Sequence, residues 1–332
     1  MKIHRMIVKE ILDSEFFQKL KEGRVALDNT TFSTWNNCFT KGLWYGGLRR
    51  VPAKPRTPLI FGEAVHLALA KHLEGKSVSE SIEAAVHMAC EKQLDLAMDA
   101  KRNVGTLTLL LTSYFDHITI FPSERLVPLT LNGVPVVEKD FSVYIGTVLD
   151  DIKVYWNGIV DLVGYSGGNL WVIDHKTTSI MGEKFADDKY RSSQMLGYYT
   201  VVLEILRELG DASLPKLQGC LINAMAMRSS GYEFKQFHLP YSPAAAEEFK
   251  SECLMNIRCI ISTLLDMEAW YNSSSGEEYY HARCNREGCV SKYGRCDYFD
   301  LCQAPAQLRQ RLAHDEGFFT TTKWNPGEEG HE

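Results

Sequence analysis

The chain has 332 residues, a formal net charge of -6, 45% hydrophobic residues and 23% charged residues. This composition is typical of a soluble globular protein, and the length allows one large domain or two ordinary ones. No apolar run approaches the roughly 20 residues of a membrane span, and the N-terminus lacks the features of a signal peptide. A cytoplasmic location without a membrane partner is therefore expected, and a nucleic-acid partner would have to bind a local basic patch.

The first half of the chain is expected to be helical and then extended. Apolar periodicity predicts helices over residues 59–73, 78–98 and 104–118. The period then changes to two, which predicts strands over residues 126–144 with Asn132-Gly133 as a hairpin turn.

In the second half, a hairpin over residues 158–178 is followed by a helix over 192–209 that ends at Gly210. Strands over 217–226 and 232–239 and an amphipathic helix over 243–272 come next. This order predicts one mixed α/β domain over residues 1–316. The domain would include a helical insertion at about 74–125 and a C-terminal cysteine-rich cap at about 273–305 that closes onto Cys38. A polar tail at 317–332 would follow it.

The hairpin GIVDLVGYSGGNLWVIDHKTT carries acidic residues in an apolar setting. A two-residue turn at Gly167-Gly168 would place Asp161 directly opposite Asp174, with Cβ atoms roughly 5 Å apart. A four-residue loop keeps this register and a three-residue loop breaks it. Lys176 would then share the face of Asp174, while the His175 side chain points to the opposite face.

Two facing carboxylates in a poorly solvated hairpin repel each other unless they hold a cation or share a proton. We therefore predict a Mg²⁺ or Mn²⁺ site at Asp161 and Asp174. The cation would polarise a phosphate and bind a water that Lys176 helps to deprotonate or orient. The alternative is a chance pair on an exposed sheet face, stabilised by Lys176.

Three motifs in this order resemble the PD-(D/E)XK nuclease superfamily. Asp161 followed by IDHKT resembles its acidic and lysine-bearing strands, although the proline of the name is absent because Ile159 and Val160 precede Asp161. GEAVH, which ends at His66, resembles the GxxxH motif of the RecB-like branch, and QMLGY resembles its QxxxY motif. Many RecB-like members share the missing proline.

The resemblance covers about residues 30–302 and implies a restriction-endonuclease-like core, with a central mixed sheet flanked by helices. It implies that His66, Asp161, Asp174 and the backbone carbonyl of His175 are ligands of Mg²⁺ or Mn²⁺. It also implies catalytic roles for Asp161, Asp174, Lys176, Gln194 and Tyr198, the last two ordering the site and contacting DNA. Glu138 lies in VVEKDF, where relatives often carry a glutamate before a strand.

Nine cysteines include a group of four in one short stretch, Cys284, Cys289, Cys296 and Cys302. In a reducing compartment such a group suggests a metal more than disulfides. With Cys38, the last three resemble the iron–sulfur nucleases of the AddB and CRISPR-adaptation types, which implies that these four cysteines bind a [4Fe–4S] cluster. If Cys284 replaced Cys38, all four ligands would be local and a Zn²⁺ site would be the alternative.

The resemblance implies a metal-dependent exonuclease that degrades DNA from free ends, often as single strands, in recombination, repair or phage DNA processing. A bacterial cell or a phage-infected host would be its setting. No GxxxxGK[ST] motif occurs, so a helicase or recombination protein would be a separate partner. The alternatives are a structure-specific endonuclease and a DNA-binding nuclease subunit of a helicase complex.

Basic residues that could hold DNA occur in two runs. Three aromatic residues near the first run, Trp35, Trp44 and Tyr45, either stack on single-stranded bases or belong to the core. The basic residues are Lys41, Arg49, Arg50, Lys54 and Arg56 in the first run and Arg283, Arg286, Lys292 and Arg295 in the second.

Overall fold

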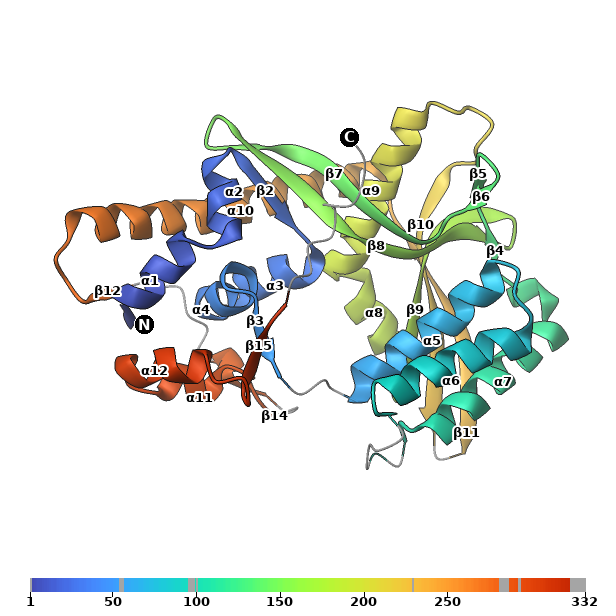
Figure 1. The fold of residues 1–332 in the computed structure, drawn as a ribbon. Coiled ribbons are helices and arrows are strands. Elements are labelled where there is room, and N and C mark those ends of the chain that lie inside the picture. The colour runs from blue at the N-terminus through green and yellow to red at the C-terminus, as the bar shows by residue number, and fades with distance from the viewer. Residues whose placement is uncertain are drawn as a thin grey trace. The chain divides into compact units, whose positions relative to one another are not determined.

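The computed structural model describes residues 2–53, 57–94, 99, 101–228, 230–280, 287–291 and 294–322. The chain forms two compact units (Figure 1). Unit 1 takes in Met1–Lys54, Ser142–Gly158 and Lys250–Glu332, and unit 2 takes in Pro55–Phe141 and Ile159–Phe249. The single domain over residues 1–316 stays a prediction.

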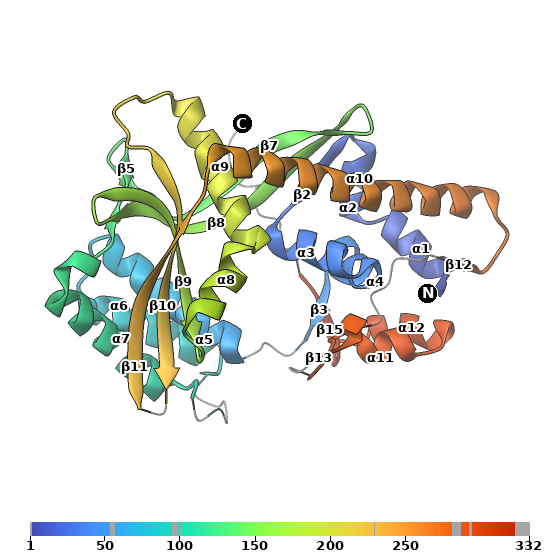
Figure 2. The same ribbon diagram turned by 180° about the vertical axis from the view of Figure 1, so that it is seen from behind.

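Unit 2 consists of a sheet with helices on both of its faces. Helices α5, α6 and α7 cover one face, and α8 and α9 cover the other (Figures 1 and 2). The helices are α5 (Thr57–Leu73), α6 (Val78–Glu91), α7 (Val104–Ile120), the 3-10 turn η3 (Pro122–Glu124), α8 (Glu183–Tyr190) and α9 (Ser193–Leu209). The strands are β4 (Val127–Pro128), β5 (Thr130–Leu131), β6 (Val134–Pro135), β9 (Asn169–Thr178), β10 (Leu217–Arg228) and β11 (Gly231–Pro240).

The central sheet is mixed, as the sequence predicts. Strands β11, β10, β9 and β8 (Ile152–Ser166) are neighbours in this order, and β4 and β7 (Val137–Val148) also pair with β8. The β9–β10 pair is parallel, whereas the β8–β9 and β10–β11 pairs are antiparallel. A mixed sheet between two helical layers buries the apolar runs of its inner strands on both faces.

The β8–β9 hairpin has the predicted register. Ser166 pairs with Asn169, and the same register continues away from the turn to Leu162 and Ile173. Asp161 and Asp174 are the next residues of the two strands in that direction. Both turn residues have positive φ, 57° at Gly167 and 79° at Gly168. A type I′ turn requires this conformation at both central positions, which explains the Gly-Gly pair.

The predicted helices are present, with shifted ends. The helix predicted over residues 78–98 ends at Glu91, since Gln93 has a left-handed φ of 62°. Helix α9 begins after Ser192, whose side chain accepts a hydrogen bond from the Met195 amide, and ends at Gly210 with a φ of 61°. A Ser N-cap and a left-handed Gly satisfy the free backbone groups at the two helix ends.

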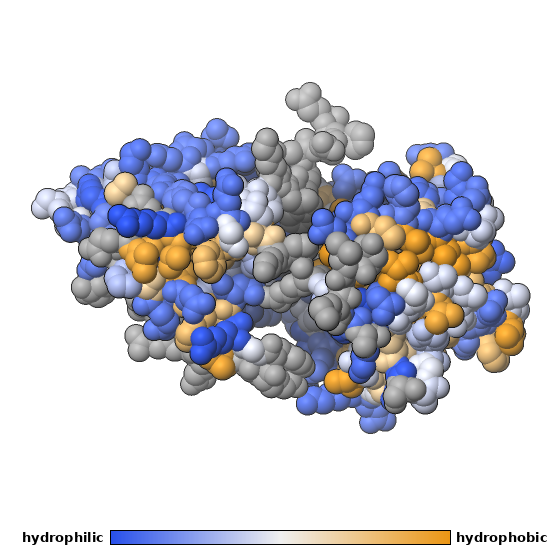
Figure 3. Space-filling model, turned by 60° about the horizontal axis from the view of Figure 1, so that its bottom comes forward, coloured by the Kyte–Doolittle hydropathy of each residue, from blue (hydrophilic) through white to orange (hydrophobic). Residues whose placement is uncertain are grey.

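The apolar core of unit 2 lies between the helices and the sheet. Residues of α5, α6 and α7, among them Phe61, Leu110 and Leu111, are buried together with Met225 and Met227 of β10. On the face in Figure 3, both units show apolar residues surrounded by hydrophilic ones. None of the helices in the described part of the chain has the length and apolar character needed to cross a membrane.

Unit 1 is largely helical. Its N-terminal elements are β1 (Lys2–His4), α1 (Arg5–Leu12), α2 (Glu15–Lys21), β2 (Arg24–Leu27), α3 (Asn29–Asn37), α4 (Phe39–Gly42), the π-helical turn η1 (Leu43–Gly47) and β3 (Arg50–Pro52). Its C-terminal elements are most of α10 (Pro243–Ser273), β12 (Glu278–Tyr280), η4 (Glu287–Cys289), β13 (Val290–Ser291), β14 (Gly294–Arg295), α11 (Phe299–Gln303), α12 (Ala306–Ala313) and β15 (Phe319–Thr321).

Strands from the two ends of the chain pair within unit 1. Strand β1 pairs with β12, and β15 pairs with β3. Strand β15 lies in the segment predicted as a polar tail. This part of the segment is ordered, because Phe319 is buried and its ring stacks on Tyr298 at 5.3 Å. Residues 323–332 of that segment lie outside the described residues.

Candidate active site

Two buried aspartates and a lysine meet where β8 and β9 diverge. Asp161 is 7% exposed and Asp174 is 1% exposed. The backbone amide of His175 donates a hydrogen bond to Asp161 Oδ2 over 2.7 Å, and Lys176 Nζ donates to Asp174 Oδ1 over 2.6 Å. Because alternate residues of a strand point to the same face, the side chains of Asp174 and Lys176 lie together. The backbone amide of His175, between them, binds Asp161.

His66 of α5 reaches the same place. Its Nε2 lies 2.8 Å from the backbone carbonyl oxygen of His175, and its Nδ1 lies 3.4 Å from Asp161 Oδ2. Glu138 Oε1 lies 3.8 Å from His66 Nδ1. One ligand atom from each of His66, Glu138 and Asp161 lies within 4.8 Å of the others. The structure therefore brings His66 and Glu138 together with Asp161.

The geometry fits a divalent cation. Asp174 Oδ2 is buried and has no hydrogen-bond partner within the described part of the chain. A buried carboxylate oxygen without a partner is costly, and a hard cation prefers such oxygens. His66 Nε2 lies 2.8 Å from the His175 carbonyl oxygen and donates a hydrogen bond to it when no cation is bound. His66, Asp161, Asp174 and the His175 carbonyl could hold that cation, with Glu138 beside them.

Without a cation, the charges at the site are balanced by protons. Burial lowers the pKa of His66, but the charge and hydrogen bond of Asp161 outweigh it and raise that pKa to about 9. Burial and the charge of Asp161 raise the pKa of Glu138 to about 7. Burial raises the pKa of Asp174 despite the charge of Lys176. Such displaced values mark functional sites more often than ordinary surface groups.

Gln194 and Tyr198 lie one turn apart on the same face of α9. The Gln194 side-chain amide donates to the Tyr198 hydroxyl over 3.2 Å, and the Tyr198 ring meets Phe141 edge-on at 6.2 Å. This pair is therefore ordered by its own helix and by β7.

A buried polar network behind β9 has no counterpart in the sequence predictions. Asn223 of β10 is 2% exposed, and its side-chain amide donates to the Tyr114 hydroxyl at 2.8 Å and to His175 Nδ1 at 3.0 Å. Burial lowers the pKa of His175 to about 3, so the ring is neutral. The signal in the sequence was one asparagine inside the apolar strand LQGCLINAMAMR.

Two further features of the site come from the tertiary structure. Glu138 has a left-handed φ of 46°, a conformation that is uncommon outside glycine and that concentrates at functional sites. Lys189 of α8 lies near Lys176 and Asp174, since the charge of Lys176 adds to burial in lowering the Lys189 pKa. No motif identified Lys189.

The four cysteines of the predicted cluster lie in unit 1. Cys38 follows α3 and precedes α4, and the backbone amide of Cys296 donates to the carbonyl of Cys289 over 2.9 Å. Burial and the charges of Cys38, Cys296 and Cys289 raise the pKa of Cys302 to about 12, so these three thiols each interact electrostatically with the Cys302 thiol. Cys284 lies outside the described residues.

Several residues considered for DNA binding make contacts within unit 1. Trp35 and Trp44 are 1% and 2% exposed, so they belong to the core and do not stack on bases. Arg50 donates to Thr321 Oγ1 over 2.7 Å, and the Arg295 guanidinium lies 4.9 Å from the ring of Phe299. The other basic residues of the two runs include five outside the described residues, Lys54, Arg56, Arg283, Arg286 and Lys292.

Comparison with known proteins identifies the family of the chain. No curated protein matches the chain. Among solved structures, a "Putative exonuclease" from Eubacterium rectale matches with a TM-score of 0.41 and 12% identity over 88% of this chain and 98% of that one. The family model of the PD-(D/E)XK nuclease superfamily, whose members use divalent metals, matches residues 42–303. The chain, with its mixed α/β restriction-endonuclease-like fold, therefore belongs to the PD-(D/E)XK nuclease superfamily.

Proposed function

We propose that this nuclease is a divalent-metal-dependent DNA exonuclease that acts from free ends and favours single strands. The observation that carries the proposal is the unpartnered, buried Oδ2 of Asp174 beside Asp161, His66 and the His175 carbonyl. The carboxylate and carbonyl oxygens among these ligands suit Mg²⁺ or Mn²⁺. Such a cation, when bound, neutralises charge on the phosphate and lowers the pKa of a water.

Several residues of the protein would orient the attacking water, position the Asp161 carboxylate and position the DNA. The Lys176 ammonium, which donates a hydrogen bond to Asp174, would orient the attacking water and stabilise negative charge on the phosphate. The His175 amide fixes the Asp161 carboxylate. Gln194 and Tyr198 present one polar face of α9, which would position the DNA strand.

Gly62 supports a close approach of the substrate. It lies one turn before His66 on α5, and a Cβ at this position would meet no atom of a neighbouring element within 4 Å among the described residues. Gly in a helix interior costs about 0.5–1 kcal/mol relative to Ala. Because the protein's own packing does not require this glycine, we assign the free space to the DNA backbone.

We propose that four cysteines of unit 1 bind a [4Fe–4S] cluster, which would link the C-terminal segment to the end of α3. These cysteines are Cys38, Cys289, Cys296 and Cys302. In the described chain, no three thiol sulfurs lie mutually within 4.8 Å, since the one such ligand group is His66, Glu138 and Asp161. A tetrahedral zinc with Zn–S bonds of about 2.3 Å holds its sulfurs roughly 3.8 Å apart. The described thiols therefore do not form such a zinc site, whereas four thiolates are the ligands that a [4Fe–4S] cluster needs.

Linear and covalently closed single-stranded DNA distinguish the candidate activities. With anaerobically purified protein and Mn²⁺, we expect loss of the linear strand alone and no loss of either strand with EDTA. Cutting of the circle would indicate an endonuclease. If neither substrate is cut without ATP, the chain would be the nuclease subunit of a helicase complex. A bacterial or phage role in recombination or repair remains part of the proposal.

A further inference from the structure

The backbone of β9 changes partners at the candidate active site. In the described strands, the backbone pairing of β8 and β9 ends at Leu162 and Ile173. Beyond that point the His175 amide donates to the Asp161 side chain over 2.7 Å, and the His175 carbonyl oxygen lies 2.8 Å from His66 Nε2. The peptide groups of His175 therefore contact the side chains of two candidate cation ligands.

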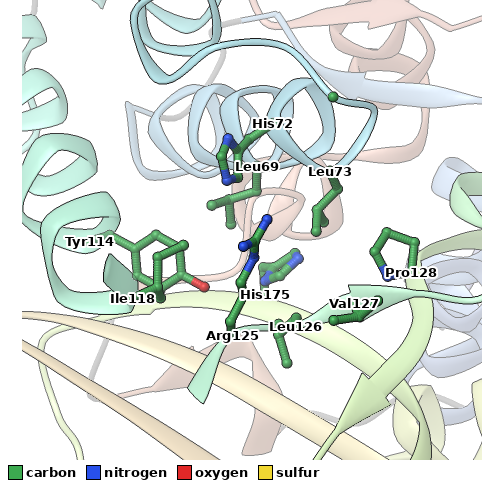
Figure 4. A pocket seen from close by; sticks show the side chains of 11 residues that line it. Leu69, His72, Leu73, Tyr114, Ile118, Arg125, Leu126, Val127, Pro128 and His175 are labelled. Carbon is green, nitrogen blue, oxygen red and sulfur yellow. The ribbon is translucent and has the colours of Figure 1, made fainter. Parts of the chain in front are cut away.

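The side chain of His175 is held from a neighbouring strand and from a helix. His175 and Asn223 are direct partners in the parallel β9–β10 pair. The Asn223 amide nitrogen lies 3.0 Å from His175 Nδ1 and 2.8 Å from the Tyr114 hydroxyl. Tyr114 of α7 and His175 line the same pocket (Figure 4). Since His175 and Asn223 are each 2% exposed, water does not compete for these hydrogen bonds.

The hydrogen bond from Asn223 sets the tautomer of the His175 ring. The amide nitrogen of asparagine only donates, so Nδ1 accepts and the proton of the neutral ring is on Nε2. Nε2 is buried and has no hydrogen-bond partner in the described part of the chain. Without Asn223, no hydrogen bond from the described residues would fix either the tautomer or the orientation of this ring.

The His175 ring also packs against a candidate ligand. It meets the His66 ring edge-on, with the ring centroids 6.0 Å apart. His66 Nδ1 lies 3.4 Å from Asp161 Oδ2, so a displaced His66 ring would change the geometry of both ligands. Groups that orient the ligands of a metal typically contribute 10–100-fold to metal affinity or activity.

We propose that Asn223 and Tyr114 are positioning residues of the cation site. Asn223 fixes the His175 ring, and Tyr114 orients the Asn223 amide. Through its ring and its peptide groups, His175 in turn positions His66 and Asp161. The inference rests on the proposed function, because it concerns the same cation. It also gives a reason for the single asparagine in CLINAMAM, an otherwise apolar and fully buried run of β10.

Asn223→Leu tests the proposal, because leucine is close to asparagine in shape and donates no hydrogen bond. We expect the Mn²⁺ affinity of the full-length protein, measured by electron paramagnetic resonance, to fall at least about tenfold. Tyr114→Phe removes one hydroxyl and keeps the ring, and it should lower the affinity by at least about twofold. The matched control is Ser81→Ala on α6, which removes a buried hydroxyl that donates to the Ser77 carbonyl over 2.8 Å. It should leave the Mn²⁺ affinity unchanged.

The network itself is tested in the metal-free protein. In ¹⁵N-histidine spectra recorded with EDTA, the His175 signals of the wild-type protein should be those of the Nε2–H tautomer. They are assigned by their absence from His175→Gln. In Asn223→Leu these signals should move or broaden, because no donor fixes the tautomer. A network that serves stability alone would show this spectral change without any change in Mn²⁺ affinity.

Wild-type Mn²⁺ affinity in Asn223→Leu, an equal loss in Ser81→Ala, or an Nδ1–H tautomer in the wild-type protein would overturn the proposal. Unchanged affinity in Tyr114→Phe would remove Tyr114 from the positioning residues. If Asn223→Leu does not fold, Tyr114→Phe replaces it as the test, and unchanged affinity there overturns the proposal. Failure of the wild-type protein to bind Mn²⁺ would contradict the proposed function as well, whereas Mn²⁺ binding that is equal in wild type and variants contradicts the inference alone.

Discussion

Replacing Asp174 with asparagine tests the site most directly, because the change removes charge and preserves shape. The Lys176 Nζ to Asp174 Oδ1 distance is 2.6 Å, which at an effective dielectric constant of 20 corresponds to about 6 kcal/mol of gross attraction. Breaking a buried pair costs about 3–5 kcal/mol net. Asparagine keeps an acceptor for Lys176, whose side chain is 23% exposed, and the variant loses the repulsion from Asp161. We therefore expect a loss in unfolding free energy of about 1–3 kcal/mol.

Cleavage should fall much further than stability. Loss of a charged cation ligand should reduce the Mn²⁺-dependent rate at least about 10³-fold, equivalent to about 4 kcal/mol in the barrier. Mn²⁺ at 100 times its Kd should stabilise the wild-type protein by about 2.7 kcal/mol, and Asp174→Asn should lose this effect. Urea unfolding with EDTA or Mn²⁺, beside cleavage of end-labelled DNA, measures both quantities.

The matched control is Asp116→Asn, the same substitution at an exposed position of α7. Its stability and its cleavage rate should match those of the wild-type protein. A cleavage rate of Asp174→Asn within tenfold of wild type, or undiminished stabilisation by Mn²⁺, would refute the assignment of this carboxylate to the metal site.

Three further substitutions test other parts of the proposal. Lys176→Met should reduce cleavage at least about 10²-fold while Mn²⁺ binding by electron paramagnetic resonance persists; loss of Mn²⁺ binding would contradict a role outside the ligand set. Gly62→Ala should raise the unfolding free energy by up to about 1 kcal/mol and lower kcat/KM for DNA, and an unchanged kcat/KM would remove the assigned backbone approach. Cys302→Ser should abolish the iron–sulfur absorbance near ~400 nm and lower the Tm; Cys259→Ser, a change at an exposed thiol of α10, should do neither, and a spectrum of Cys302→Ser equal to wild type would exclude Cys302 as a ligand.

The sequence by itself determined the local geometry of the catalytic hairpin. A Gly-Gly pair favours a type I′ turn, and a period of two then fixes which residues face each other, so the register of β8 and β9 followed from the chain alone. The helix over residues 193–209 was equally predictable, because Ser192 and Gly210 are local signals for its two ends.

Only the tertiary structure decided which distant residues join the hairpin. Glu138 reaches His66 from another strand, and Asn223 orders the His175 ring from β10. No local pattern encodes these contacts, because they depend on strand order and on how β9 lies between β8 and β10. Burial was also undecided by the sequence: Trp35 and Trp44 could stack on bases or fill a core, and the packing of α3, α4 and η1 placed both in the core.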